Sequence, residues 1–178
     1  MHFTAGLIDV FAETPFGGNP LAVVEHADGL SDAPMRRIAG EFNQAETTFV
    51  MKSDRADRKL RSFTASGAEV FGAGHNALGA WLWLGEHGQL GSLDTPKTFR
   101  QEIGGDVLPI TLANVDGRVH GRMRQAALRL STPMAATDAL AEALEQATDA
   151  DAPLPAARAA DTGAAHLMVR LRDAQTVD

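Results

Sequence analysis

A run of apolar residues directly after a glycine-rich turn constrains the fold of this 178-residue chain more than any other feature. The run covers residues 76–84, mixes small side chains with large ones, and follows the turn at residues 72–75. A helix that is apolar on every face is typical of a buried helix and not of a surface helix. Ala77, Gly79 and Ala80 are small enough to let surrounding strands approach closely. The pattern therefore predicts a central helix enclosed by a curved sheet.

Short apolar and β-branched segments on both sides of this run are typical of strands. They lie at residues 7–11, 21–24, 46–51, 59–64, 98–103, 106–113 and 117–124. Ser31 and Asn43 are expected to bound a helix, because Ser31 is able to cap it and apolar residues recur inside it at helical spacing. Strands and helices in this mixed order predict an α+β fold.

The composition excludes several classes of function. The chain has no cysteine, which excludes disulfides, thiolate metal sites and a cysteine nucleophile or acid/base pair. A net charge of −7 argues against nucleic acid and anionic membrane as partners, and no apolar run approaches the ~20 residues that a membrane-spanning helix needs. The first residues lack the basic and apolar segments of a secretory signal. We therefore expect a cytoplasmic protein that acts on a small molecule or on another protein.

The character of the chain changes after Pro133. Residues 137–147 have the pattern of an amphipathic helix, residues 149–161 are rich in Ala, Pro and Asp as in a linker, and residues 164–171 are strand-like. The sequence therefore predicts a first domain at residues 1–133, a helix and linker at 134–163, and the first strand of a second, truncated unit at 164–178.

Three local clusters carry residues that are able to do chemistry. The first, at residues 17–24, forms either a plain turn before a strand or a loop whose backbone approaches a ligand. In the second, Glu46 stands where a helix ends and a strand begins. Partial burial there would raise its pKa and suit it to proton transfer near neutral pH, whereas the alternative is a solvated glutamate at a sheet edge.

In the third cluster, His75 stands at the start of the predicted buried helix. There it would polarise or protonate a substrate carbonyl or carboxylate together with the N–H groups of the helix end, or it would serve only as a polar cap. No spacing in the sequence matches a zinc site, a P-loop or a nucleophile elbow.

In this order and spacing, the clusters resemble the PhzF-like family of phenazine-biosynthesis isomerases and their relatives. The resemblance rests on motifs at residues 9–11, 15–24, 30–31, 43, 46–50, 61–64, 67, 69–70, 74–75 and 78–79. Residues 9–133 look like the N-terminal half of that family, and residues 162–163 and 166–169 look like the first strand of its C-terminal half. The chain departs from the family pattern at residues 71–73, where the family usually has a proline, an apolar residue and a cysteine, and at Asn76 and Ala77.

The resemblance implies a fold shared with diaminopimelate epimerase. In that fold two similar halves each wrap a curved, mostly antiparallel, barrel-like sheet around a central helix, and the active site lies in the cleft between them. It also implies proton chemistry without a metal or a cofactor. In the phenazine enzyme a glutamate moves a proton on trans-2,3-dihydro-3-hydroxyanthranilate; Glu46 occupies the place of that glutamate, and His75 that of a histidine that binds and polarises the substrate. The residues expected to contact the substrate are Gly18, Asn19, Gly74 and Asn76.

Three hypotheses about the chain follow from the resemblance. In the first, the chain is an isomerase of tautomerase or epimerase type whose second half comes from another polypeptide or from a second copy. In the second, it is a non-catalytic binding or assembly module that keeps the half-fold. In the third, it is a shortened form of a full-length enzyme. A half-fold alone would expose the apolar surface meant for its other half, so we expect an oligomer.

Overall fold

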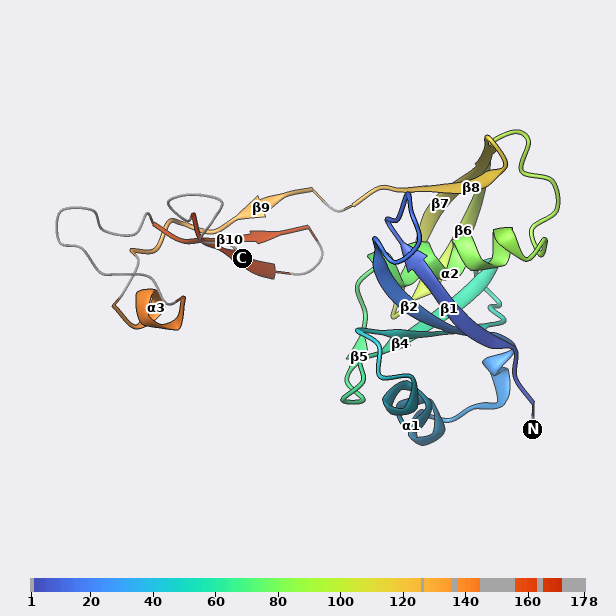
Figure 1. Cartoon of the computed structure of the whole chain (residues 1–178), viewed down its shortest axis with the longest axis horizontal. Helices are drawn as coiled ribbons and strands as arrows, with labels where there is room; N and C mark the ends of the chain where they lie inside the picture. Colours follow the sequence, from blue (N-terminus) through green and yellow to red (C-terminus); the bar gives the residue numbers. More distant parts are fainter. Residues whose placement is uncertain (1, 126, 136–137, 145–155, 163–164, 171–178) are drawn as a thin grey trace. The chain divides into compact units, whose positions relative to one another are not determined.

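The computed structural model describes residues 2–125, 127–135, 138–144, 156–162 and 165–170. The chain forms two compact units, Met1–Arg124 and Gln125–Asp178 (Figure 1). The larger unit contains Glu46 and His75, so its architecture decides how these two side chains are placed.

A curled, mixed sheet makes up most of the larger unit (Figure 1). Its main path runs through β1 (Ala5–Val10), β2 (Asn19–Val24), β3 (Thr47–Met51), β4 (Arg58–Phe63), β6 (Lys97–Ile103), β7 (Asp106–Val115) and β8 (Arg118–Met123), and β5 (Glu69–Val70) pairs with β4 beside this path. Pairs β2–β3 and β4–β6 are parallel, and the other pairs in this sheet are antiparallel. Parallel neighbours need a crossover connection, and the two parallel pairs are those with a long helix between them in the chain.

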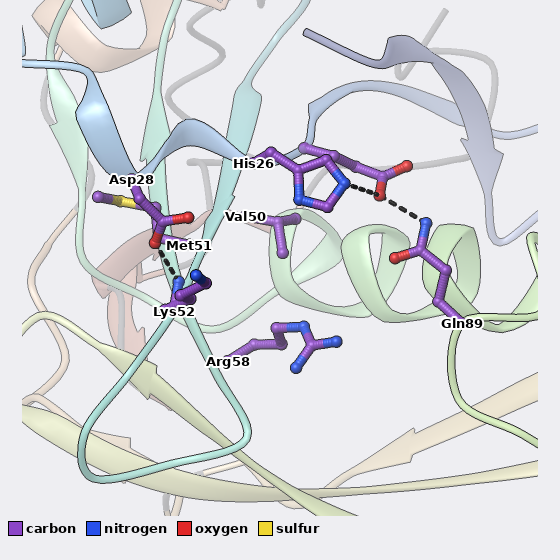
Figure 2. A pocket seen from close by; sticks show the side chains of 8 residues that line it. His26, Asp28, Val50, Met51, Lys52, Arg58 and Gln89 are labelled. Atoms are coloured by element: carbon purple, nitrogen blue, oxygen red, sulfur yellow. Dashed lines mark hydrogen bonds and ion pairs between the residues drawn. The ribbon is translucent and has the colours of Figure 1, made fainter.

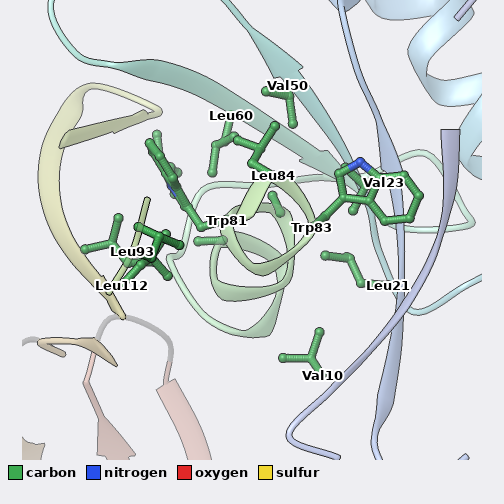
Figure 3. Close-up of a cluster of buried hydrophobic side chains, with 14 residues drawn as sticks. Val10, Leu21, Val23, Val50, Leu60, Trp81, Trp83, Leu84, Leu93 and Leu112 are labelled. Atoms are coloured by element: carbon green, nitrogen blue, oxygen red, sulfur yellow. The ribbon is translucent and has the colours of Figure 1, made fainter. Parts of the chain in front are cut away.

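Helix α2 (His75–Glu86) is the crossover between β4 and β6. It contacts both β1 and β8, which lie at the two ends of the strand order, and the sheet must therefore curl into a half-barrel. Figure 3 shows Trp81, Trp83 and Leu84 of this helix among strand side chains. A Cβ atom at Gly79 would lie only 2.6 Å from a side-chain carbon of Leu21, so close packing between helix and strand requires glycine there.

Helix α1 (Asp32–Phe42) packs against β3 and β4 and forms a second, smaller core with them. The predicted bounds are confirmed, because Ser31 is the N-cap and Asn43 is the C-cap in the left-handed region, with φ of 50°. Phe49 of β3 belongs to this smaller core, and its neighbour Val50 belongs to the core around α2. Because side chains alternate along β3, this strand contributes to the core around α2 on one face and to the core under α1 on the other. A short 3-10 helix, η1 (Ala27–Gly29), precedes α1.

The smaller unit contains a sheet in the order β11 (Ala165–Met168), β10 (Arg158–Asp161), β9 (Arg129–Leu130), with both pairs antiparallel, and helix α3 (Asp138–Ala143). The prediction of a helix and linker at residues 134–163 is wrong at residues 158–161, which form β10. The two alanines of that strand have weak strand propensity, so its pairing with β9 and β11 decides the conformation. Of the predicted linker at residues 149–161, residues 149–155 lie outside the described residues, and Ala157 forms an antiparallel β-bridge with Met134. Residues 164 and 171 of the predicted strand also lie outside the described residues. The division into domains at residues 133 and 163 stays a prediction.

Among the described residues, no helix has the length and apolar character that crossing a membrane requires.

Candidate active site

The structure brings Glu46 and His75 together. Glu46 directly precedes β3, and its carbonyl accepts a hydrogen bond from the Ala22 N–H at 3.3 Å. His75 is the first residue of α2. The Nδ1 atom of His75 lies 3.4 Å from Oε2 of Glu46, and only 13% and 17% of the two side chains are exposed. Two residues that are 29 positions apart in the chain therefore form one partly buried pair.

Strand direction explains why candidate residues gather at one edge of the sheet. Since β2 and β3 are parallel, with Ala22 opposite Thr47, both strands begin at the same edge. Asn19 is the first residue of β2, and Glu46 stands directly before β3. Helix α2 begins at this edge too, because His75 contacts Glu46. The three elements therefore begin at the same edge of the sheet.

Burial governs the electrostatics of the pair. It raises the pKa of Glu46 above its ordinary value, and the nearby His75 opposes that shift. The buried atoms Oε2 of Glu46 and Nε2 of His75 have no hydrogen-bond partner within the described ranges. Buried polar atoms in proteins are nearly always hydrogen-bonded, so unpaired ones call for an explanation. A carboxyl with a raised pKa beside an imidazole is suited to taking up and returning a proton.

Gly74 and Asn76 flank His75, and their polar groups are engaged within the chain. The Gly74 N–H donates to Oδ1 of Asn76 at 2.8 Å. The Nδ2 group of Asn76 donates to Oγ of Ser62 at 3.1 Å and to the Gly72 carbonyl at 3.0 Å. Asn76 is only 2% exposed. These contacts shape the start of α2, and substrate contacts by Gly74 and Asn76 stay predictions.

Gly18 and Asn19 lie at the end of the loop between β1 and β2. The Gly18 N–H donates to Oδ2 of Asp9 at 3.2 Å, and a Cβ atom at Gly18 would lie 2.3 Å from the Val10 carbonyl oxygen. The loop therefore requires glycine at this position. Asn19 is exposed at the start of β2. Substrate contacts by these two residues also stay predictions.

Sequence reasoning missed Thr48 and Ser62, which bond to each other and to Asn76 beside the pair. In the sequence they are ordinary members of two strand segments. Only the register of β3 against β4, which places Thr48 opposite Ser62, reveals the contact.

Two hollows on the larger unit lie apart from the pair, and neither is lined by Glu46 or His75. Figure 2 shows His26, Lys52, Arg58 and Gln89 around the first, of about 170 Å³, at the edge where β2 and β3 end. The second, of about 400 Å³, is lined by residues of β1, α2 and β8. In the part of the chain that the structure describes, no group of three or more His, Cys, Asp or Glu side chains is arranged to hold a metal ion.

Comparison with known proteins shows the family of the chain. A family model described as PhzC-PhzF, phenazine biosynthesis-like protein, matches residues 8–178. An uncharacterised isomerase of Pasteurella multocida is 50% identical over 95 residues, which make up 52% of this chain and 31% of the relative. Trans-2,3-dihydro-3-hydroxyanthranilate isomerase of Pseudomonas fluorescens is 46% identical over 82 residues, or 46% of this chain and 29% of that enzyme.

Solved structures share the fold. A PhzF-family phenazine biosynthesis protein of Bacillus anthracis has a TM-score of 0.81 and 28% identity, and the match covers 99% of this chain and 58% of that chain. A hydroxyproline epimerase of Agrobacterium vitis, at 14% identity, has a TM-score of 0.62 over 96% of this chain and 52% of that chain, which shows the fold alone. The chain thus spans about a third of the length of these curated relatives and just over half of these solved structures.

Proposed function

The chain belongs to the PhzC-PhzF family of phenazine biosynthesis-like proteins, and on that basis we propose that it is an isomerase that moves a carbon-bound proton on a small, carboxylate-bearing cyclic substrate, with Glu46 as the general acid and base. The relative from Pseudomonas fluorescens is named for trans-2,3-dihydro-3-hydroxyanthranilate, so this compound is the first substrate to test. The reaction needs no cofactor in this proposal.

The single observation that supports the reaction most strongly is the partly buried Glu46–His75 pair with its unpaired polar atoms. A proton bound to carbon is removed slowly unless a base is held close to it in a site that largely excludes water. As a carboxylate, Glu46 takes the proton, and the electron pair of the broken C–H bond passes into the conjugated system of the substrate. As a carboxylic acid, it returns the proton to another carbon, so the atoms of substrate and product balance. Its raised pKa stabilises the protonated form that the second step uses.

His75 binds and polarises the substrate in this proposal. Its Nδ1 faces Glu46, which leaves the buried Nε2 atom for a substrate oxygen. A substrate carboxylate or carbonyl at that position would give Nε2 the partner that it lacks among the described residues. The charge that develops on the substrate when the proton leaves would then be stabilised by a group already in place.

The remaining side of the cleft is supplied, in this proposal, by residues outside the larger unit, contributed by a second polypeptide or a second copy. The relatives are longer than the matched regions, and exposed aromatic side chains at Phe11, Phe16 and Phe71 offer the apolar surface that such a contact needs. Light scattering of the purified chain tests the assembly. A dimer or larger species supports a second copy of this chain as the source, and a monomer at micromolar concentration contradicts that source and leaves a second polypeptide.

Solvent deuterium incorporation tests the reaction. We expect the chain, together with the second half where this is required, to introduce deuterium from D2O into trans-2,3-dihydro-3-hydroxyanthranilate, as followed by proton NMR. Glu46→Gln should abolish incorporation. The matched control is Glu41→Gln, which neutralises an exposed glutamate on α1 and should leave incorporation unchanged. No incorporation under either condition would contradict the proposal and favour a binding or assembly role.

A further inference from the structure

A buried group of three polar side chains lies behind the Glu46–His75 pair, and their hydroxyl and amide groups are hydrogen-bonded within the chain. Thr48, Ser62 and Asn76 are 0%, 3% and 2% exposed, and we call them the positioning cluster. We propose that this cluster sets the distance and orientation between Glu46 and His75, and so acts as a positioning device for the proton transfer. The inference rests on the proposed function for its catalytic consequence, whereas its geometric part stands without it.

The Asn76 side chain closes the turn that holds His75. Its Oδ1 accepts the Gly74 N–H, and its Nδ2 donates to the Gly72 carbonyl. The amide orientation is fixed by these two contacts, because a flipped amide would place its oxygen against the Gly72 oxygen and its NH2 against the Gly74 N–H. His75 is thus held between two residues that are bonded to each other.

The hydroxyl groups of Ser62 and Thr48 extend the hydrogen bonds of Asn76, and each bond in this series has only one possible donor. Nδ2 of Asn76 also donates to Oγ of Ser62 at 3.1 Å, Oγ of Ser62 lies 2.8 Å from Oγ1 of Thr48, and Oγ1 of Thr48 lies 3.3 Å from the Asn76 carbonyl oxygen. That carbonyl only accepts, so Thr48 must donate to it and Ser62 must donate to Thr48. The bonds form a closed ring that begins and ends at Asn76, and each hydroxyl both accepts and donates. A ring of fully satisfied buried groups is rigid, because losing any member leaves its neighbours unpaired.

The ring joins the two elements that carry the pair. Side chains two positions apart on a strand share a face, so Glu46 and Thr48 both point toward the start of α2. There Glu46 meets His75, and Thr48 meets Asn76. Two adjacent contacts between β3 and the start of α2 restrict both how the helix end slides along the strand and how it turns. The 3.4 Å contact between Glu46 and His75 alone would restrict these movements less. The third member, Ser62, lies opposite Thr48 on β4 and anchors the ring to the rest of the sheet.

The carboxyl of Glu46 provides a readout of this geometry that needs no substrate. His75 lowers the pKa of Glu46 against the upward effect of burial, so movement of His75 away from Glu46 would raise that pKa further. Beside burial, His75 is the group that shifts the pKa of Glu46 within the described structure. The titration of the Glu46 carboxyl carbon, followed by NMR in ¹³C-labelled protein, therefore reports whether the pair keeps its distance.

Thr48→Val removes the hydroxyl at nearly constant volume, and Thr48→Ser keeps the hydroxyl. We expect Thr48→Val to raise the Glu46 titration midpoint by about half a pH unit. Under the proposed reaction it should also lower kcat by about tenfold, with KM nearly unchanged. Thr48→Ser should restore both values. Asn76→Ala is the second variant and should act in the same direction as Thr48→Val.

A matched control separates positioning from general stability. Gln101→Leu removes a buried hydrogen bond to the Trp81 indole N–H, 2.9 Å long, that lies away from the pair. It should destabilise the fold and leave both the Glu46 midpoint and kcat unchanged. If folded Thr48→Val or Asn76→Ala protein keeps the wild-type midpoint and kcat, the cluster only stabilises the fold and the proposal is wrong. If the midpoint moves but the wild-type protein shows no isomerase turnover, the positioning claim stands and the proposed function fails.

Discussion

Two carboxylates, the buried Glu25 and the partly buried Glu46, lie at opposite ends of the parallel strands β2 and β3. Glu25 directly follows β2, and its carboxylate accepts hydrogen bonds from the Trp83 indole N–H at 2.7 Å and from Nε2 of Gln89 at 2.5 Å. Glu46 directly precedes β3, and its Oε2 has only the 3.4 Å contact with His75 and no hydrogen bond within the described part of the chain. The two groups are alike in type and differ in whether their surroundings satisfy them.

This difference separates a structural carboxylate from a reactive one better than burial does. Glu25 is the more buried of the two, at 2% exposure, yet two donors satisfy its two oxygens and tie the end of β2 to the end of α2 and the segment after it. Glu46 is left with an unpaired oxygen, which is costly in an isolated protein and useful where a substrate supplies the missing partner. The unsatisfied carboxylate is therefore the better candidate for chemistry.

The largest effect should come from neutralising each carboxylate in turn and measuring proton exchange. Glu46→Gln keeps the size of the side chain and removes its basicity, so we expect the exchange rate to fall by about 10²- to 10⁴-fold. Glu25→Gln should leave the rate within about twofold of wild type, because an amide oxygen still accepts from Trp83 and lies at the far edge of the sheet. The measurement is deuterium incorporation from D2O under identical conditions. Equal losses of exchange rate in the two variants would contradict the conclusion that Glu46 is reactive and Glu25 is structural.

For the free energy of unfolding, changing Glu25 should have a larger effect than changing Glu46. Glu25→Ala leaves the buried Trp83 indole N–H without its acceptor and frees Gln89, which we expect to lower the free energy of unfolding by about 2–4 kcal/mol. Glu25→Gln is the matched control and should retain most of the stability, since the exposed Gln89 amide can turn its oxygen toward the new NH2 group. Urea denaturation at neutral pH measures both. A loss below about 1 kcal/mol for Glu25→Ala would mean that Glu25 is not a structural anchor.

The sequence predicts a role for Glu46 but gives no signal for Glu25. Glu46 is a candidate because a carboxylate between a helix end and a strand start is expected to be partly buried, and because it occupies the place of the glutamate in the PhzF-like family. The predicted bounds of α1 are confirmed, and Asn43 in the left-handed region ends the helix, but the Ser31 side chain makes no capping hydrogen bond. The partners of Glu25 lie 58 and 64 positions away, so only the folded arrangement of β2 and α2 reveals them. The ring of Thr48, Ser62 and Asn76 was missed for the same reason.

Local sequence propensity also gave a wrong prediction where pairing between strands decides the conformation. Residues 158–161 are half alanine and were predicted to be a linker, yet they form the middle strand of the smaller sheet. The 3.4 Å distance between Glu46 and His75 likewise depends on how α2 crosses the half-barrel, which no short window of sequence encodes.

The free energy of unfolding should depend on pH through the partly buried Glu46. Because burial raises the pKa of Glu46 above its ordinary value of 4.5, the folded protein holds this proton more tightly than the unfolded chain does. Stability from this group is therefore lost as the pH rises from 4.5 through the raised pKa. Glu46→Gln does not titrate, so at pH 8 it should be more stable than wild type by about 1 kcal/mol, and the gain should vanish below pH 4.5. Thermal unfolding of both proteins from pH 4 to pH 8 tests the sign, and a constant difference between them would contradict it.

The smallest effect should come from Gln89→Ala, which removes one of the two donors to Glu25 and keeps the other. Gln89 is exposed, so water can replace its amide on Oε2 of Glu25, and we expect a loss of only about 0.5 kcal/mol in the free energy of unfolding. Because the Trp83 bond remains, this variant isolates the contribution of the buried donor when it is compared with Glu25→Ala. A loss as large as that of Glu25→Ala would show that the exposed amide, and not the indole, anchors the carboxylate. The difference between Glu25 and Glu46 would then come from Gln89, in the segment after α2, and not from the buried hydrogen bond between Trp83 and Glu25.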